Sequence, residues 1–329
     1  MSATEEFSQD CLRIDPAATA ADIESAIREI VFGKLKRKGA VVAISGGVDS
    51  SVVAALCSGA LGNQHVLGLM LPEAGSSPDS LRLAHLQASR IGIRTQVEDI
   101  TPILTAAGCY QRCAGAIRKV IPEFHEGLKF KIVLPNLLEA VAYPIFSVVV
   151  QLADGSQKKS RLTYETYLGL VAAMNFKQRT RKMMEYYYAD LLNYAVVGTP
   201  NRLEYDQGFF VKNGDGAADL KPIAHLYKSQ VYQLAAHLGV PEEIQKRTPT
   251  TDTYPLEQSQ EEFYFTLSLE KMDFCLYGKN HGISPASLAP VLGLKEAQVE
   301  RVYAIIESKR RAARYLHAAP MLVKQLDGI

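Results

Sequence analysis

The chain has 329 residues, 47% of them hydrophobic and 22% charged, which is typical of a globular protein with a substantial core. Its 36 basic and 35 acidic residues give a formal charge of +1, so broad electrostatic attraction to nucleic acid is not expected. No apolar run reaches membrane-spanning length, and the polar start Met1–Asp10 does not resemble a signal peptide. Five cysteines without zinc-ribbon spacing indicate buried thiols in a reducing, cytoplasmic compartment: Cys11, Cys57, Cys109, Cys113 and Cys275.

Strands and helices alternate over the first hundred residues. Apolar residues at helical spacing predict a first helix across 23–35. The pattern then predicts three strands at 41–45, 65–71 and 94–100, separated by helices at 50–61 and 78–91. Near-continuous apolar strands of this kind indicate a doubly wound parallel sheet covered by helices on both faces. Ligands of such sheets bind beyond the carboxyl ends of the strands.

Residues 105–165 interrupt this alternation. A helix is expected at 110–121, and two strands at 146–152 and 157–162 flank Asp154-Gly155, a dipeptide that favours a tight hairpin turn. We interpret the segment as an insertion with a β-hairpin in a single domain of residues 1–329. Further on, the sequence predicts a helix at 176–192, a strand at 194–199, a polar loop at 200–220, a helix at 227–238 and a mainly helical extension at 260–329.

The run Ala43-Ile44-Ser45-Gly46-Gly47-Val48-Asp49-Ser50-Ser51 joins the first strand to the following helix. A glycine pair at such a junction brings backbone N–H groups toward one anion, and the helix N-terminus adds positive potential. Asp49 is a hard oxygen ligand suited to Mg²⁺. The lysine of the GxxxxGK[ST] phosphate loop is missing. A glycine pair alone also fits an ordinary strand–turn–helix corner. With its flanking elements, the run predicts a loop that holds pyrophosphate as a leaving group.

The SGGxDS pattern resembles the pyrophosphate loop of the N-type ATP pyrophosphatases. Further blocks in the same order resemble the ammonia-dependent NAD synthase family, which has a Rossmann-like, adenine nucleotide alpha hydrolase-like fold. The blocks span about residues 22 to 260 and include Asn175–Arg179, Gly198–Glu204, Gly214–Asp219, Pro222–Gln230 and Thr248–Asp252.

The resemblance implies a role for each matching residue. Asp49, Glu204 and Lys228 would be catalytic, and Asp49 and Glu204 would hold Mg²⁺. The residues implied to bind ATP are Ser45, Gly46, Gly47, Asp49, Ser50, Ser51, Thr199, Lys228 and Thr250. Those implied to bind the acid substrate, deamido-NAD, are Arg179, Lys212, Asp219 and Lys309. The reaction implied is adenylation of a carboxylate by ATP, followed by attack of ammonia to give an amide and AMP.

Three features depart from the family pattern. The insertion is longer than a minimal NAD synthase carries, Ser308 stands where the family has a histidine beside Lys309, and residues 252–258 replace a short acidic-apolar stretch. An amide ligase of the same superfamily acting on another carboxylate therefore stays open as the alternative.

Partners follow from the same resemblance. It implies a homodimer, and Met183, Tyr187 and Leu191 lie at the helical spacing of an interface, although core packing explains them equally well. The chain has no room for a glutamine amidase domain, so we expect free ammonia or a separate glutaminase subunit as the nitrogen source. A non-catalytic nucleotide-binding protein and a tRNA-thiolating enzyme are weaker readings, because the carboxylates and Lys228 are kept and no basic extension is evident.

Overall fold

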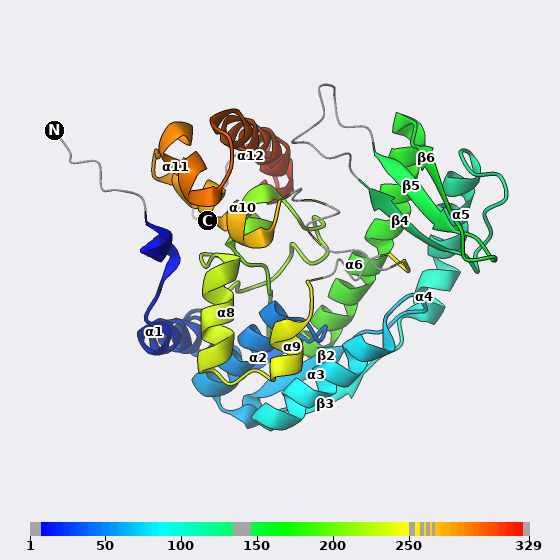
Figure 1. Cartoon of the computed structure of the whole chain (residues 1–329). Coiled ribbons are helices and arrows are strands. Elements are labelled where there is room, and N and C mark those ends of the chain that lie inside the picture. The colour runs from blue at the N-terminus through cyan, green and yellow to red at the C-terminus, as the bar shows by residue number, and fades with distance from the viewer. Residues whose placement is uncertain are drawn as a thin grey trace.

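The computed structural model describes residues 8–133, 146–249, 254–256, 260, 264 and 267–324. A parallel sheet of four strands in the order β3-β2-β1-β7 forms the base of the molecule (Figure 1). The predicted parallel sheet is therefore confirmed. Its strands are β1 (Ala40–Ala43), β2 (Val66–Met70), β3 (Arg94–Val97) and β7 (Ala195–Val197).

Helices cover both faces of this sheet because side chains alternate along each strand. Ala40 and Val42 of β1 belong to one apolar core, whereas Val41 belongs to a second core on the opposite face. The first face packs against α1 (Pro16–Arg28), α2 (Val48–Leu61), α3 (Pro78–Ile91) and α8 (Lys228–His237). The second packs against α4 (Thr101–Ala106) and α6 (Tyr164–Leu192). The short helical segments η2 (Glu29–Lys34) and η3 (Asn63–His65) complete this half, whereas η1 (Gln9–Leu12) contributes Leu12 to a separate core near the C-terminus.

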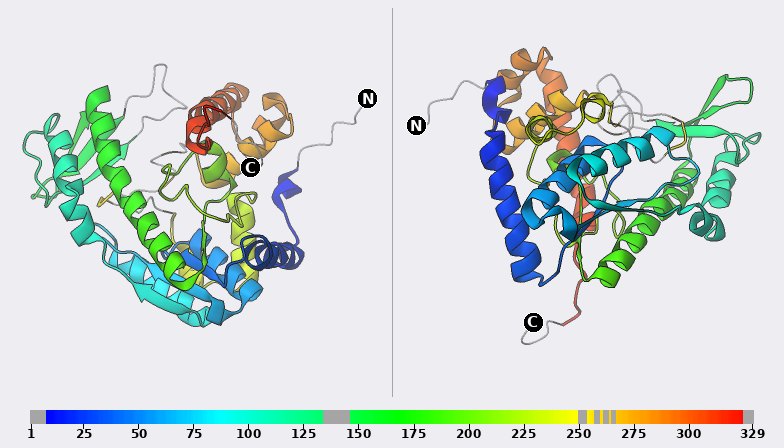
Figure 2. Two further views of the ribbon diagram at one scale, coloured as in Figure 1. Left: turned by 180° about the vertical axis from the view of Figure 1, so that it is seen from behind. Right: turned by 90° about the horizontal axis from the view of Figure 1, so that it is seen from below.

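The predicted hairpin is confirmed within a second, antiparallel sheet of order β4-β5-β6. Its strands are β4 (Lys129–Val133), β5 (Ser147–Gln151) and β6 (Gln157–Arg161). This sheet packs on α5 (Cys109–Arg118) and the first half of α6, and it projects from the parallel sheet (Figure 2). Strand β4 was not predicted, because alternating lysines in Lys129–Val133 leave a short apolar pattern.

Helix α6 begins at Tyr164 rather than at the predicted Phe176. The Thr163 hydroxyl caps it by accepting a hydrogen bond from the Thr166 N–H at 3.2 Å. Leu170, Ala173 and Met174 in the added turns are buried against the second sheet. The expected loop at 200–220 also contains a short helix, α7 (Arg202–Gln207), whose N-cap is Asn201.

Helices dominate the C-terminal part, as predicted, within the described residues. After α9 (Glu242–Lys246) they are α10 (Leu269–Asn280), α11 (Pro285–Leu292) and α12 (Glu296–His317), which share their own apolar core. None of the helices in the described ranges combines the length and the apolar character that a bilayer span requires.

A buried ion pair ties the inserted sheet region to the loop that follows β2. Lys177 of α6 lies 2.8 Å from Glu73, and both side chains are at most 4% exposed. Tyr110 of α5 donates a 2.7 Å hydrogen bond to the same carboxylate. Burial alone would raise the pKa of Glu73, but the Lys177 charge and these hydrogen bonds hold it below 4.5. The carboxylate is therefore ionised and neutralised inside the fold.

Replacing Lys177 with methionine is expected to lower the free energy of unfolding by about 3–5 kcal/mol, because Glu73 would remain buried without its counter-ion. Adding Glu73→Gln to Lys177→Met should restore much of the loss. The matched control is Lys119→Met, which breaks the exposed pair with Glu165 and should cost no more than about 1 kcal/mol. Urea unfolding measures all three, and equal losses for Lys177→Met and Lys119→Met would refute the buried-pair account.

Candidate active site

The loop between β1 and α2 turns sharply at Gly46, whose φ is +79°. A Cβ atom there would lie 2.4 Å from the Ser80 carbonyl oxygen, so both the dihedral angle and the space require glycine. The first turn of α3 therefore presses against this loop and fixes its course. Gly47 then serves as the N-cap of α2 without a side-chain cap, which leaves the start of that helix facing the loop.

Three serine hydroxyls hold this loop in shape. Ser50 Oγ lies 3.2 Å from both the backbone N–H and the hydroxyl of Ser45, and it donates to the Gly47 carbonyl at 3.0 Å. Ser51 Oγ donates to the same carbonyl at 2.8 Å and is fully buried. Ser45 and Ser50 lie on the cavity surface, whereas Gly46 and Ser51 support them from behind. The loop is thus pre-shaped for an anion.

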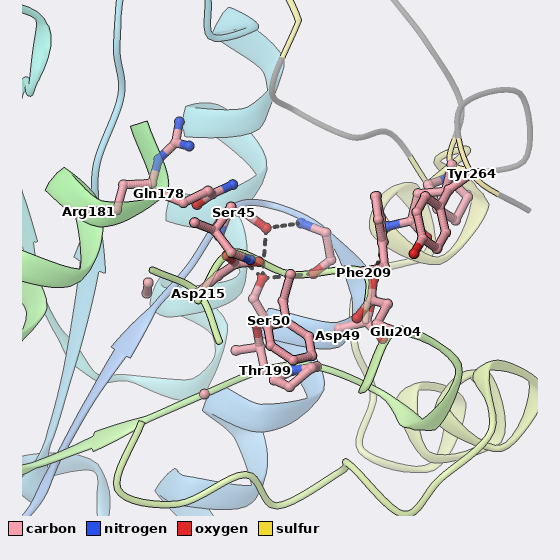
Figure 3. Close-up of a pocket in the computed structure, with 18 of the residues that line it drawn as sticks. Ser45, Asp49, Ser50, Gln178, Arg181, Thr199, Glu204, Phe209, Asp215 and Tyr264 are labelled. Atoms are coloured by element: carbon pink, nitrogen blue, oxygen red, sulfur yellow. Dashed lines mark hydrogen bonds between the residues drawn. The ribbon is translucent and has the colours of Figure 1, made fainter. Parts of the chain in front are cut away.

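A cavity of about 420 Å³ opens above the loop (Figure 3). Its floor is Ser45 and Gly47–Ser50 together with Thr199, which follows β7. One wall comes from α6, where Gln178 projects toward the loop and Arg181 donates to the Leu71 carbonyl at 3.4 Å, and the other comes from Phe209 and Tyr264. A smaller cavity of about 70 Å³ shares Ser45 and Arg181 with it and has mainly apolar sides: Ile44, Leu69, Met70, Leu71, Pro72 and Leu81. The large cavity lies beyond the carboxyl ends of β1 and β7, the edge of the sheet at which ligands of parallel sheets bind.

Two carboxylates and one lysine meet at the floor of the large cavity. Lys228, at the start of α8, forms an ion pair with Asp49 Oδ2 and is 2% exposed. Asp49 Oδ1 accepts a hydrogen bond from Asn201 Nδ2 at 3.1 Å. Glu204 Oε2 accepts one from the Asn201 N–H at 3.2 Å, and Glu204 Oε1 accepts one from Gln260 at 3.0 Å. Figure 3 shows Asp49 and Glu204 next to each other.

The protonation states of Glu204 and Lys228 depend on their burial and on the charges of the neighbouring residues. Burial and the negative charge of Asp49 raise the pKa of Glu204 from 4.5 to about 7, against the opposing charge of Lys228. Burial would lower the pKa of Lys228, but the charges of Asp49 and Glu204 outweigh it and raise that pKa. Lys228 is therefore charged at neutral pH, and it partly neutralises two neighbouring carboxylates.

The C-terminal helices position Lys228. Asp273 of α10 is fully buried and accepts a 2.7 Å hydrogen bond from the Ser229 N–H in the first turn of α8. A carboxylate at a helix N-terminus is favourable. Burial nevertheless raises the pKa of Asp273 to about 6. The extension is therefore part of the support of the site.

The structure does not place all predicted residues at the cavity. Arg179 on α6 is exposed and donates to the Lys212 carbonyl at 3.3 Å, and Lys212 Nζ donates to the Tyr315 and Ala318 carbonyls. Asp219 accepts hydrogen bonds from Tyr186 and from the Val196 N–H. These three lie outside the described cavity lining. Thr250 lies outside the described residues, as do residues 252, 253, 257 and 258 of the segment that departs from the family pattern.

Lys309 of α12 lies behind the aromatic wall of the cavity. Its Nζ donates to the Tyr264 carbonyl and sits 3.6 Å from the centroid of that ring. Tyr264 in turn stacks on Phe209 with 4.7 Å between centroids. Burial lowers the pKa of Lys309 to about 7. Movement of the aromatic pair would thus be required before Lys309 reaches the cavity.

Sequence reasoning missed several residues of the site. Asn201 bridges the two carboxylates, and Gln260 holds Glu204. Arg247, after α9, lines the cavity and donates to Ser80 Oγ at 2.9 Å, beside the loop. Asn201 had a signal, because Asn-x-x-Glu is a capping-box spacing. Arg247 and Gln260 had no such sequence signal, because their position at the cavity depends on the path of the chain after α8.

Comparisons with known proteins identify the family of the chain. The family model described as NAD synthase matches residues 19–121 and 136–313. The NH(3)-dependent NAD(+) synthetase of Rhizobium meliloti (strain 1021) is 55% identical over 323 residues, covering 98% of this chain and 96% of the relative. The enzyme of the same name from Thermotoga neapolitana is 37% identical over 280 residues, covering 84% and 88%.

Solved structures show the same fold at lower identity. NMN synthetase from Francisella tularensis has a TM-score of 0.63 at 19% identity, covering 94% of this chain and 98% of that one. NH3-dependent NAD synthetase from Campylobacter jejuni has a TM-score of 0.60 at 21% identity, covering 94% and 100%. With the family model matching most of the chain and close relatives along almost its full length, this protein belongs to the NAD synthase family.

Proposed function

We propose that this chain is an ammonia-dependent ligase that converts deamido-NAD, ATP and ammonia into NAD, AMP and pyrophosphate. The observation that carries the proposal is the meeting of Asp49, Lys228 and Glu204 on the floor of a cavity whose loop is shaped for an anion. The names and the identity of the relatives supply the substrate.

ATP would lie across both cavities. The apolar sides of the small cavity suit a nucleobase, and the shared Ser45 leads from there to the anion-binding loop. The pyrophosphate would rest on the loop Ser45–Ser51, with Lys228 and Thr199 beside it. Thr250 completes the proposed ATP contacts. The α-phosphate would then face the open space of the large cavity, where the acid substrate enters.

The donor set at the floor suits Mg²⁺. The structure shows one hydrogen bond or ion pair to each of the four carboxylate oxygens of Asp49 and Glu204, and a carboxylate oxygen has a further lone pair. Mg²⁺ is commonly held by one or two carboxylates together with substrate phosphates. Among the described residues no cluster of three or more acidic, histidine or cysteine ligands exists. When bound, the ion would neutralise charge on the phosphates.

The chain's own groups account for the two chemical steps. The substrate carboxylate attacks the α-phosphate in line, the bond to pyrophosphate breaks, and an acyl-adenylate forms. Lys228 and the loop N–H groups stabilise the departing charge. Ammonia then attacks the acyl carbon, AMP leaves, and an amide remains. Holding both substrates in one cavity removes much of the entropic barrier, so no covalent enzyme intermediate is needed.

The acid substrate would contact Arg179, Lys212, Asp219 and Lys309. Support comes from their arrangement, since Arg179 donates to Lys212 and Asp219 accepts from Tyr186, which lies two turns along α6 from Arg179. The same helix exposes Met183, Tyr187 and Leu191, each more than half exposed. We infer a homodimer in which this face is covered by the second copy, so that the surface residues join the site.

We propose that the protein acts in the cytoplasm and that its nitrogen source is ammonia. All five cysteines are free thiols, which fits the reducing cytoplasm. Ammonia would enter free or from a separate glutaminase.

We also propose that residues 105–165 are an insertion in a single domain of residues 1–329, with 260–329 as its helical extension. The inserted sheet has its own apolar core yet shares α6 with the parallel sheet.

A product assay tests the proposed function. Purified protein with ATP, Mg²⁺ and ammonium is given deamido-NAD or, in parallel, nicotinate mononucleotide, and AMP and the amide are followed by chromatography. NAD and AMP in equal amounts are expected with deamido-NAD. AMP formation with the mononucleotide alone would contradict the proposed substrate and favour the alternative of another carboxylate.

The raised pKa of Glu204 predicts a pH-dependent metal affinity. Below about pH 7 the carboxyl group holds a proton that a metal must displace, so Mn²⁺ should bind about tenfold more weakly at pH 6 than at pH 8. The folded-state pKa lies above the usual 4.5, so the group's stabilising contribution is present below pH 4.5 and disappears as pH rises toward 7. Electron paramagnetic resonance without nucleotide measures the Mn²⁺ affinity. Equal affinities at the two pH values would refute the prediction.

A further inference from the structure

We propose that Asn201 is the positioning residue that holds the two proposed metal carboxylates at a fixed separation before any ligand binds. The inference rests on the proposed metal role of Asp49 and Glu204. Asn201 is 1% exposed and follows β7 within the Gly198–Glu204 block. It is a neutral residue and would not itself contact the substrates.

Asn201 uses three polar groups to join two helices. Its side-chain NH₂ donates to Asp49 Oδ1 on α2, and its side-chain oxygen accepts from the Glu204 N–H at 3.1 Å. Its backbone N–H donates to Glu204 Oε2. The same amide therefore caps α7 and orients the carboxylate in the first turn of α2. A cap alone would need the side-chain oxygen but not the NH₂ group.

The two hydrogen bonds from Asn201 offset an unfavourable interaction, because two carboxylates in one buried site repel each other. Their repulsion contributes to the raised pKa of Glu204, as described above. With no bridge, Asp49 would be free to turn toward Lys228 alone and away from Glu204. Two donors from one rigid residue keep one oxygen of each carboxylate occupied and their remaining lone pairs available. A metal would then bind without first having to reorient its ligands, which is how outer partners of metal ligands act.

The capping role and the bridging role separate in two variants. Asn201→Ser keeps an oxygen that caps α7 but is too short to reach Asp49. Asn201→Asp also caps, yet it offers no donor to Asp49 and adds a like charge. Ser284→Ala, which removes the cap of α11, is the matched control for lost capping.

The test is Mn²⁺ binding by electron paramagnetic resonance, together with thermal unfolding and the Mn²⁺ dependence of kcat. We expect Asn201→Ser to bind Mn²⁺ about tenfold more weakly and Asn201→Asp up to about a hundredfold, with Tm lowered by at most about 4 °C. Saturating Mn²⁺ should restore much of kcat in Asn201→Ser. Ser284→Ala should lower Tm and leave Mn²⁺ affinity unchanged.

Two results would overturn the inference. Wild-type Mn²⁺ affinity in Asn201→Ser would show that the bridge does not act on the metal site. A fall in Tm well beyond about 4 °C in both variants, with kcat not recovered by Mn²⁺, would reduce Asn201 to a structural cap. The Mn²⁺-binding and unfolding measurements are independent of the acid substrate, so a protein that binds Mn²⁺ as expected but makes no NAD would contradict the proposed function and leave this inference standing.

Discussion

Asp49→Asn is expected to lower the rate of AMP formation by about a thousandfold while the fold stays intact. The size follows from the loss of one of the two carboxylates proposed to hold the Mg²⁺ that would neutralise the reacting phosphates, and one such preorganised electrostatic element is worth about 10²–10³ in rate. Asparagine keeps the shape of the side chain and an oxygen, but it removes the charge that pairs with Lys228 and attracts a metal. The effect should appear in kcat more than in the KM for ammonia, because the role proposed for Asp49 lies in the adenylation step.

The control for Asp49→Asn is Asp79→Asn, which breaks an exposed pair with Arg82 at the start of α3 and should leave the rate unchanged. Circular dichroism and Tm of both variants should match the wild-type protein. An Asp49→Asn enzyme with a tenth or more of wild-type activity would contradict the metal and charge role given to Asp49.

Lys228→Met has the second large effect, on stability and rate together. Methionine fills a similar volume but leaves Asp49 and Glu204 in a buried site without their cation, so we expect about 3–5 kcal/mol less stability at pH 8. At pH 5.5 the loss should shrink, because protonation of Glu204 removes one of the two charges. AMP formation should fall by about 10²–10³.

The comparison variant for Lys228→Met is Lys246→Met, whose ion pair with Glu242 is about three-quarters exposed. It should change stability by less than about 1 kcal/mol at either pH. If Lys228→Met lost the same stability at pH 5.5 as at pH 8, the charge account would be wrong and simple packing would explain the loss.

Local sequence patterns predicted the part of the candidate site that one continuous segment forms, namely the loop between β1 and α2. The loop Ser45–Ser51 could be read because a glycine pair, a strand before it and a helix after it all occur within a few residues. The structure adds why Gly46 is needed there, namely the Ser80 carbonyl of α3. The parallel sheet was predictable for the same reason, since β1, β2 and β7 are short and apolar and a helix follows each of the first two, whereas β3 is a polar strand at the edge.

Contacts between elements far apart in the chain could not be predicted from the sequence. The buried pair of Lys177 and Glu73 joins positions far apart, and nothing near either residue marks them as partners. The predicted range of α6 was too short. Its first half is buried against the inserted sheet, and the first strand of that sheet carries alternating lysines and was not predicted. Gln260 and Arg247 reach the site through tertiary packing alone. Three of the residues that the family resemblance gave to the acid substrate, Arg179, Lys212 and Asp219, lie outside the cavity lining, which is why a second copy belongs to the proposal.

Transfer of oxygen from the acid substrate to AMP tests the proposed chemistry most directly. Deamido-NAD labelled with ¹⁸O in both carboxylate oxygens is incubated with the protein, ATP, Mg²⁺ and ammonium, and the products are analysed by mass spectrometry. Attack of the carboxylate on the α-phosphate requires one ¹⁸O in AMP and one in the amide of NAD. AMP without label, or label in pyrophosphate or phosphate, would contradict an acyl-adenylate and with it the roles assigned to the loop and to Lys228.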